Sequence, residues 1–322
     1  MSNSLVSVVV PTFNRAHLLR DALDSVNAQD HRPLEIIVVD DGSVDDTASV
    51  VALWSRAHAE VPVRYIRQEN SGGNVARNRG IAEACGDFVA FLDSDDRWAP
   101  DKIKRQVARL SGNPALGAVY CGVLESVVET GETMPFDNRP WPEGRILKSL
   151  LVRDVTAPTS AWLVRRKVLD RAGGFDETLE ARQDWDLWIR IAKETEIGAI
   201  KAPLAELRHH EGERTNSNID REIRSHRRIL QKYAEDRKKC GVKVRLAALS
   251  AFHRRAGRVA AHHRRKPLLA MAHYLGAVAY WPLAWDNYAA LMGLFLPGSL
   301  RSELRIRWNK LFGESALGIR NH

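Results

Sequence analysis

The chain has 322 residues, of which 44% are hydrophobic, and a formal net charge of +8. This length allows a large buried core and a second structural unit. The three cysteines, Cys85, Cys121 and Cys240, are isolated, which excludes a disulfide framework and a zinc site of the usual spacing. No secretory signal is visible at the amino terminus, so we expect a cytoplasmic protein.

The charge is unevenly divided along the chain. Residues 1–219 contain 27 Lys and Arg against 33 Asp and Glu, whereas residues 220–322 contain 21 against 7. The two parts therefore have net charges of −6 and +14, which predicts two different surfaces. We expect a first domain at 1–219 and a basic, aromatic-rich helical region at 220–322.

Strands and helices are predicted to alternate in the first part of the chain. Apolar runs predict strands at 5–10, 34–39, 63–67 and 88–92. Helical spacing of apolar residues predicts helices at 18–26 and 74–84, and Ser43 with Asp46 predicts the start of a helix that runs through Trp54. Such alternation predicts an α/β fold, with a mostly parallel sheet flanked by helices and ligands bound beyond the carboxyl ends of the strands.

Three carboxylates, Asp93, Asp95 and Asp96, follow the predicted strand 88–92 directly. Clustered anions repel one another, and burying them is costly unless a cation neutralises them. A divalent metal shared with a phosphorylated ligand is one explanation. A capped turn that leads into a helix near Trp98 is the other, and this motif alone does not decide between them.

Thr12, Asn14 and Asp41 also lie at the carboxyl ends of predicted strands, so we expect them to share one crevice with the acidic cluster. Asp41 could accept a hydrogen bond from a base N–H. The chain contains neither a Gly-x-Gly-x-x-Gly fingerprint after its first strand nor a P-loop, so phosphates would have to be bound in another way.

Four segments, at 6–15, 35–43, 70–78 and 91–96, resemble in this order the signature motifs of glycosyltransferase family 2. The resemblance covers about residues 5–215. It implies a GT-A fold with a Rossmann-like sheet, followed here by a C-terminal helical extension. It also implies a nucleotide-diphosphate sugar as donor, and a UDP-sugar is the first expectation. A divalent Mn²⁺ or Mg²⁺ ion and inversion at the anomeric carbon are further implications.

The resemblance also assigns roles to individual residues. It implies that a set of polar residues and one proline contact the nucleotide: Pro11, Thr12, Asn14, Arg15, Asp41, Arg77 and Asp93. Asp95 and Asp96 become candidate metal ligands, and which of the two binds the metal is open. His210 fits the spacing of a histidine that completes the metal site in similar proteins, with His209 as its rival. A strand at 197–202 with a turn at Pro203 is expected before these histidines.

Asp184 begins a predicted helix and shares its face with Leu187, Trp188 and Ile191, so we expect it to point inward. An inverting transfer needs a carboxylate that takes the proton of the acceptor hydroxyl, and Asp184 is the candidate for this general base. A buried aspartate that only caps the helix is the alternative. Asp186 is expected to form an exposed ion pair with Arg190.

Two further positions are assigned to the acceptor side by the resemblance. Gly174 lies in the glycine-containing loop 173–176, and Trp185 follows the candidate base directly. The family usually has Glu where this chain has Gln183, which leaves the role of that neighbour open. An ordinary glycine turn is the alternative for the loop.

The apolar stretch 267–297 is interrupted by Pro282, Asp286 and Asn287, so its pieces are too short to span a membrane and two short helices are expected. They could form a helical hairpin similar to a tetratricopeptide pair, or lie on an anionic membrane surface. Nucleic-acid binding is not expected, because no recognised motif accompanies the charge. The flanking basic residues are Arg264, Arg265, Lys266, Arg301, Arg305, Arg307 and Lys310.

These features predict a metal-dependent inverting glycosyltransferase. Its acceptor would be the hydroxyl of a glycan or a lipid-linked sugar in cell-surface polysaccharide or lipid-linked glycan synthesis, at the inner face of the membrane. One alternative is a sugar nucleotidyltransferase, which would normally need a glycine-rich, basic phosphate loop that this chain lacks. The other is a non-catalytic module that binds a sugar or a nucleotide.

Overall fold

The structure is a computed structural model that describes residues 4–136, 141–210, 219–262 and 266–295. The chain forms two compact units. The first comprises Met1–Ile146, Val155–Leu179 and Gln183–Glu213, and the second comprises Leu147–Asp154, Glu180–Arg182 and Arg214–His322. The predicted boundary at 219 and 220 lies near this division, but two short segments from within the predicted first domain belong to the second unit.

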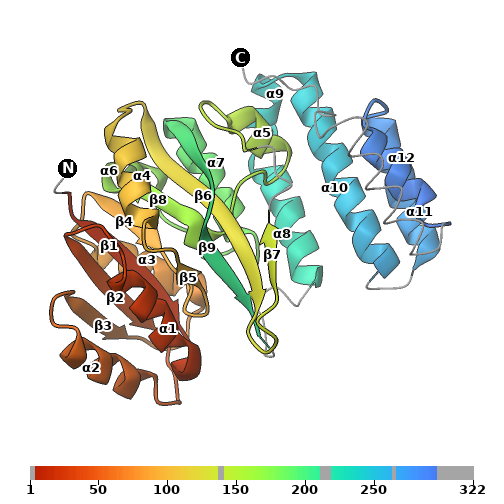
Figure 1. Ribbon diagram of the computed structural model, residues 1–322. Coiled ribbons are helices and arrows are strands. Elements are labelled where there is room, and N and C mark those ends of the chain that lie inside the picture. Colours follow the sequence, from red (N-terminus) through yellow and green to blue (C-terminus); the bar gives the residue numbers. More distant parts are fainter. Residues whose placement is uncertain (1–3, 137–140, 211–218, 263–265, 296–322) are drawn as a thin grey trace. The chain divides into compact units, whose positions relative to one another are not determined.

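Within the described residues, nine strands of the first unit form one sheet in the order β3-β2-β1-β4-β8-β6-β9-β5, with β7 paired to β6 (Figure 1). The strands β1, β2, β3 and β4 are parallel neighbours, which confirms the predicted α/β fold. The sequence of β1 is apolar and rich in β-branched residues, and all of its residues are buried. The elements of this half are β1 Val6–Thr12, α1 Ala16–Asn27, β2 Leu34–Asp40, α2 Thr47–Ala57, β3 Val63–Arg67, α3 Gly73–Glu83 and β4 Phe88–Phe91.

The start of α2 differs from the prediction. The helix begins at Thr47 rather than near Ser43, and Asp45 accepts hydrogen bonds from the backbone N–H and the hydroxyl of Thr47. The Ser43 hydroxyl instead accepts a hydrogen bond from the backbone N–H of Asn14. Ser43 therefore connects the ends of two strands and does not cap a helix.

Antiparallel pairing enters the sheet at β8, which lies between β4 and β6. The predicted turn at Pro203 is wrong, because β9 runs through it from Glu196 to His209. The register between β6 and β9 shifts at Cys121 and Gly122, so the strand absorbs the proline as an irregularity. The remaining elements of this unit are β5 Arg97–Trp98, α4 Lys102–Ser111, β6 Leu116–Val127, β7 Thr133–Phe136, η1 Thr159–Ala161, β8 Trp162–Arg165, α6 Arg166–Ala172, α7 Gln183–Glu194 and β9 Glu196–His209.

Large aromatic side chains fill the core beneath α7. Trp162 of β8 and Trp188 of α7 are both 0% exposed, and their rings stack with centroids 3.8 Å apart. Stacked rings of this size bury a large apolar area and fix the rotation of the helix against the sheet. This packing holds α7, the helix that also carries Asp184, against the sheet.

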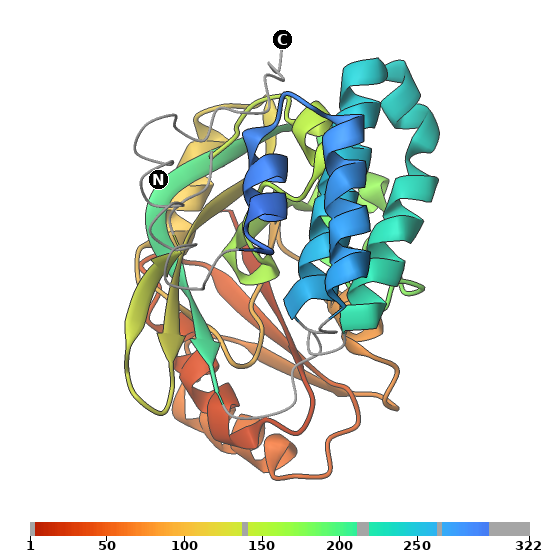
Figure 2. The same ribbon diagram turned by 90° about the vertical axis from the view of Figure 1, so that its right-hand side faces the viewer.

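The second unit is helical in its described part (Figure 2). The helices α11 and α12 confirm the two predicted short helices, and Asn287 stabilises the turn between them by donating to the carbonyls of Ala277 and Trp281 at 3.0 Å. Among the described helices, none combines the length and the apolar character that crossing a bilayer requires. Of the predicted flanking cations, only Lys266 lies within the described residues. The helices are α5 Leu147–Val152, α8 Ile219–Lys232, α9 Ala234–Lys239, α10 Val242–His262, α11 Pro267–Tyr280 and α12 Trp285–Met292.

Candidate active site

The predicted nucleotide-binding residues lie at one edge of the sheet. β1 pairs in parallel with β2 on one side and with β4 on the other, so the carboxyl ends of all three strands lie together. The backbone N–H of Asp41 donates to the carbonyl of Thr12 at 2.9 Å, and the N–H of Leu92 donates to the carbonyl of Val9 at 3.0 Å. Residues that are far apart in the sequence therefore meet beyond these strands.

Asp41 stabilises the loop that leads into α3. Its carboxylate accepts hydrogen bonds from Gln68 Nε2 at 2.8 Å, from the backbone N–H of Ser71 at 2.9 Å and from that of Gly72 at 2.8 Å. Asp41 is only 4% exposed, and the negative charge is matched by these donors. The predicted contact of Asp41 with the base of a nucleotide would come in addition to these hydrogen bonds.

Asn14 joins the ends of β1 and β2. Its side-chain Oδ1 accepts from the backbone N–H of Val44 at 2.9 Å, and its own N–H donates to the Ser43 hydroxyl at 2.9 Å. The residue has a φ of 51°, a left-handed conformation that asparagine tolerates better than most residues. Beside it, the Thr12 hydroxyl is buried and has no hydrogen-bond partner among the described residues.

The three carboxylates of the acidic turn have different partners. Asp93 forms an ion pair with Arg77, with Oδ1 and Nη2 2.5 Å apart. Asp95 forms an ion pair with Arg15, and its Oδ2 lies 3.3 Å from His210 Nε2. Arg77 and Asp93, both predicted nucleotide contacts, therefore pair with each other, whereas Asp95, a predicted metal ligand, lies between the predicted nucleotide contact Arg15 and the predicted metal ligand His210.

Asp96 points into the protein. It is 3% exposed and accepts hydrogen bonds from the Ser160 hydroxyl at 2.5 Å and from the backbone N–H of Arg208 at 3.3 Å. Burial, together with the negative charges of Asp93 and Asp95, raises the pKa of Asp96 well above its usual value. This environment does not favour the predicted role of Asp96 as a metal ligand.

The two histidines that follow one another at the end of β9 face different partners. His209 Nε2 lies 3.0 Å from Glu125 Oε2 on β6, whereas His210 lies beside Asp95. The alternation of side chains along a strand accounts for this separation. In the described part of the chain no three metal-binding side chains gather at one point, so Asp95 and His210 form a pair rather than a closed metal site.

Ser160 stabilises the acidic turn through its hydroxyl and its backbone carbonyl. Its hydroxyl accepts from the backbone N–H of Asp93 at 3.1 Å while donating to Asp96, and its carbonyl accepts from Trp98 Nε1 at 2.7 Å. Ser160 is 1% exposed, so these bonds are protected from water. The sequence carries no local signal for this role, because the partners lie more than 60 residues away.

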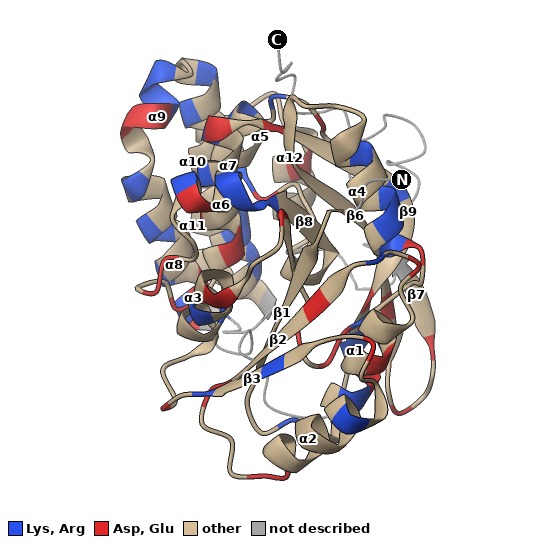
Figure 3. Ribbon diagram, turned by 90° about the vertical axis from the view of Figure 1, so that its left-hand side faces the viewer, with Lys and Arg blue, Asp and Glu red and all other residues tan. Residues whose placement is uncertain are grey.

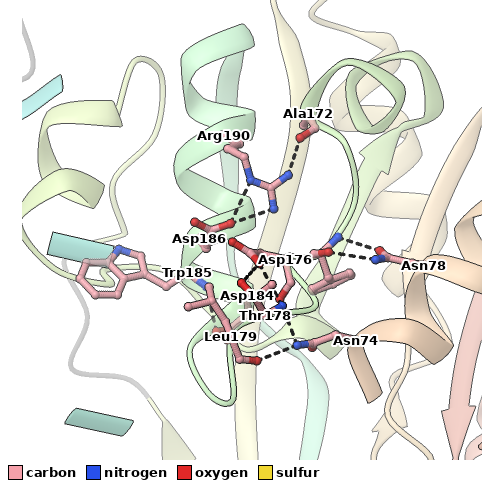
Figure 4. A network of polar contacts seen from close by, with 11 residues as sticks. Asn74, Asn78, Ala172, Asp176, Thr178, Leu179, Asp184, Trp185, Asp186 and Arg190 are labelled. Atoms are coloured by element: carbon pink, nitrogen blue, oxygen red, sulfur yellow. Dashed lines mark hydrogen bonds and ion pairs between the residues drawn. The ribbon is translucent and has the colours of Figure 1, made fainter. Parts of the chain in front are cut away.

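Asp184 lies in the first turn of α7 and is half-buried, with its Oδ1 accepting from the N–H of Trp185 at 2.8 Å (Figure 4). Asp186 is 0% exposed and forms an ion pair with Arg190 at 2.9 Å. The ion pair was predicted, but its predicted exposure is wrong. Residues 185–189 are all buried, so the helix has no outer face at this point that the helical period could identify.

The predicted acceptor loop is attached to α3. Asn78 Nδ2 donates to the carbonyl of Phe175 at 2.9 Å, and Asn74 Nδ2 donates to that of Leu179 at 2.9 Å (Figure 4). Gly174 has a φ of +65°, and a Cβ added there would lie 2.5 Å from Asn78 Oδ1. Trp185, the other predicted acceptor residue, is 0% exposed, so a direct contact would require its ring to be uncovered.

The sequence profile described as Glycosyl transferase family 2 matches residues 7–173, which is more than half of the chain. The chain belongs to this family. The match covers the acidic turn, Ser160 and the helix α3, but ends before Asp184 and His210. The fold and the family predicted from the motifs are thereby confirmed, while the roles of single residues remain predictions.

Several family members are similar to this chain. An uncharacterised glycosyltransferase of Rickettsia felis is 31% identical over 226 residues, which cover 68% of this chain and 36% of the relative. The Bacillus subtilis protein TuaG, named as a teichuronic acid biosynthesis glycosyltransferase, is 42% identical over 103 residues, or 32% of this chain and 40% of the relative. The relatives from Rickettsia conorii and Rickettsia bellii are likewise matched over 37% and 30% of their own length, whereas those from Rickettsia typhi and Rickettsia prowazekii are matched over 67% of theirs.

Solved structures share the fold. S. aureus TarS 1-349 in complex with UDP-GlcNAc has a TM-score of 0.62 and 20% sequence identity, with 89% of this chain and 90% of that chain covered. The mannosyltransferase PcManGT from Pyrobaculum calidifontis, in complex with GDP-Man and Mn²⁺, has a TM-score of 0.57 and 22% identity, with 96% and 89% covered. This chain therefore shares its fold with both structures.

Proposed function

We propose that this family 2 member is a metal-dependent inverting glycosyltransferase that moves a sugar from a nucleoside-diphosphate sugar to an acceptor hydroxyl. The observation that carries the proposal is the pairing of Asp93 with Arg77 and of Asp95 with Arg15 at the carboxyl edge of the sheet. Two arginines and two aspartates beyond the carboxyl ends of the strands match a ligand that has a diphosphate and a metal. On binding, the arginines could turn to phosphate oxygens, which they recognise in a forked geometry.

Asp95 and His210 are the residues that we assign to the metal. Their Oδ2 and Nε2 atoms lie 3.3 Å apart, so both side chains could bind the same cation. A site with two protein ligands leaves positions for diphosphate oxygens and water. A bound cation would neutralise the charge that develops on the departing diphosphate. Asp96 is left out of this set because Ser160 and the Arg208 backbone already occupy its oxygens.

Asp184 is the proposed general base. Its half-buried carboxylate lies at the start of α7, where it could take the proton of an attacking hydroxyl. Asp186 is not a competitor for this role, since it is fully buried and its charge is compensated by Arg190. Gly174 and its loop, which α3 orders through Asn78, would border the acceptor.

We further propose that the acceptor is a glycan or a lipid-linked sugar of the cell surface and that the second unit contacts an anionic membrane surface. TuaG, by its name, supports the first part. Lys and Arg are spread over α8, α9 and α10 (Figure 3), and Leu268 and Leu283 are 77% and 84% exposed on and beside α11. Apolar side chains edged by cations suit the interface of an anionic bilayer.

The test is a ligand screen followed by a product assay. Nucleoside diphosphates should raise the melting temperature of the protein, more so with Mn²⁺, because a ligand that binds only the folded state stabilises it. A transferase should then slowly release a nucleoside diphosphate from its sugar nucleotide. Release of pyrophosphate from a nucleoside triphosphate would instead identify a nucleotidyltransferase, and binding without any product would identify a binding module.

A further inference from the structure

Helix α8 of the second unit contacts the three residues that precede α7. Glu222 forms an ion pair with Arg182 at 2.5 Å, Ser225 Oγ accepts from the backbone N–H of Ala181 at 3.2 Å, and Arg224 pairs with Glu180 at 2.8 Å. All of these residues belong to the second unit, although the segment Glu180–Arg182 lies between two parts of the first unit in the sequence. The chain thus enters the helical unit immediately before it forms α7.

The ion pair of Glu222 is less exposed to water than an ordinary surface pair and involves two arginines. Glu222 contacts Arg255 of α10 as well as Arg182, and its side chain is 19% exposed, as is that of Arg182. Burial alone would raise the pKa of Glu222, but hydrogen bonds from Arg255 and the charges of the two guanidinium groups outweigh it and lower the pKa. Glu222 therefore remains ionised between two cations.

Arg182 has an unfavourable backbone conformation. Its φ is +58°, in the left-handed region that residues other than glycine rarely adopt without support. Gln183, the next residue, begins α7, and Asp184 follows it. A left-handed residue at this place turns the chain into the helix, so the conformation of Arg182 determines where the first turn of α7 starts.

We propose that Glu222 is a positioning residue for transfer: by binding the side chain of Arg182, it maintains the left-handed turn that orients the carboxylate of Asp184. This proposal rests on the proposed role of Asp184 as the base. The effect would run along the chain, because Arg182 and Asp184 are only two residues apart. A displacement of the base by about 1 Å is enough to cost on the order of 100-fold in rate.

The variant Glu222→Gln tests the proposal, since it keeps the size of the side chain and removes its charge. We expect kcat for transfer to fall roughly 10- to 100-fold, with the KM for donor and the affinity for nucleoside diphosphate unchanged. Hydrogen exchange should become faster at the backbone amides of residues 181–185, a readout that does not depend on activity. Glu180→Gln is the matched control: it makes the same charge change in an exposed pair, with side chains 60% and 51% exposed, and should leave both readouts unchanged.

Arg182→Gln removes the same ion pair from the other side and decides the question if Glu222→Gln fails to fold. Parental kcat and parental hydrogen exchange in the variant that folds would overturn the proposal, and so would an equal loss of nucleotide binding, which would indicate a general structural role. These outcomes can be distinguished from a failure of the proposed function. If Asp184 is not the base, Asp184→Asn itself will retain transfer.

Discussion

Asn78 of α3 forms a pair of hydrogen bonds with the backbone of Phe175, donating to its carbonyl at 2.9 Å and accepting from its N–H at 2.7 Å. Residue 77, its neighbour on the same helix, is the arginine that pairs with Asp93. One helix therefore contacts both the predicted nucleotide side and the predicted acceptor side. A change in α3 should affect both substrates.

The metal assignment predicts different effects for two neighbouring histidines. His210→Ala should weaken the Mn²⁺-dependent part of nucleotide binding, because it removes the partner of Asp95. His209→Ala is the matched control, since His209 pairs with Glu125, and it should bind like the parent. Calorimetric titration of nucleoside diphosphate with and without Mn²⁺ gives the comparison. Equal effects of the two substitutions would contradict the assignment of His210.

The two aspartates of α7 should separate chemistry from stability. Asp184→Asn should bind donor and metal like the parent and lose transfer by roughly 10²- to 10⁴-fold, because an amide cannot take a proton at neutral pH. Asp186→Asn should retain most of the transfer rate but lower the free energy of unfolding by roughly 1–3 kcal/mol, because it leaves Arg190 without its buried partner. Single-turnover transfer and thermal unfolding measure the two effects. Transfer by Asp184→Asn within a few-fold of the parent would remove the base assignment.

Two adjacent glycines test the acceptor loop. Gly173 and Gly174 both have positive φ angles, of +82° and +65°, so alanine at either should cost roughly 1–2 kcal/mol of stability. Only at Gly174 would the added Cβ also meet Asn78, at 2.5 Å. We therefore expect Gly174→Ala to melt at a lower temperature than Gly173→Ala, because Asn78 would be displaced from Phe175, and we expect loss of transfer, measured below both melting temperatures, only in Gly174→Ala. Equal transfer rates would show that this loop does not serve the acceptor.

The exposed leucines of the second unit predict membrane binding. Leu268→Glu and Leu283→Glu should reduce co-sedimentation with anionic liposomes without changing the melting temperature, since both side chains are largely exposed. Added salt should also reduce co-sedimentation, because it screens the attraction between basic residues and lipid headgroups. If variant and parent sediment equally, the leucines have another role, such as contact with a second copy of the chain.

The local sequence was enough to predict an element where a single physical effect, the burial of apolar residues, determines its structure. The runs 5–10 and 34–39 are apolar and β-branched, and they form β1 and β2, which are buried as such runs require. Distinct motifs in a fixed order also identified the family. The metal-binding role that the resemblance gives to His210, which lies beside Asp95, stays a prediction.

Prediction failed where a distant partner decides the outcome. The carbonyl of Ala202 lies so close to Gly122 that only a glycine fits, and this pairing lets β9 continue through Pro203. The exposure of Asp186 was mistaken because α7 is covered on both of the faces that the helical period distinguishes. Ser160 bonds to partners 62–67 residues away in the sequence, and no pattern within its own segment indicates them.

The segment Leu147–Asp154 limits how this protein can be divided. Leu151 of α5 is 0% exposed, and its carbonyl accepts from Arg237 Nε of α9 at 2.7 Å. A fragment that ends at residue 219 would keep α5 but lose Arg237, so an apolar helix would face water and a buried carbonyl would lose its donor. Residues 1–219 are thus not an exchangeable module, and a graft of the helical unit onto another protein would have to carry α5 and residues 180–182 with it.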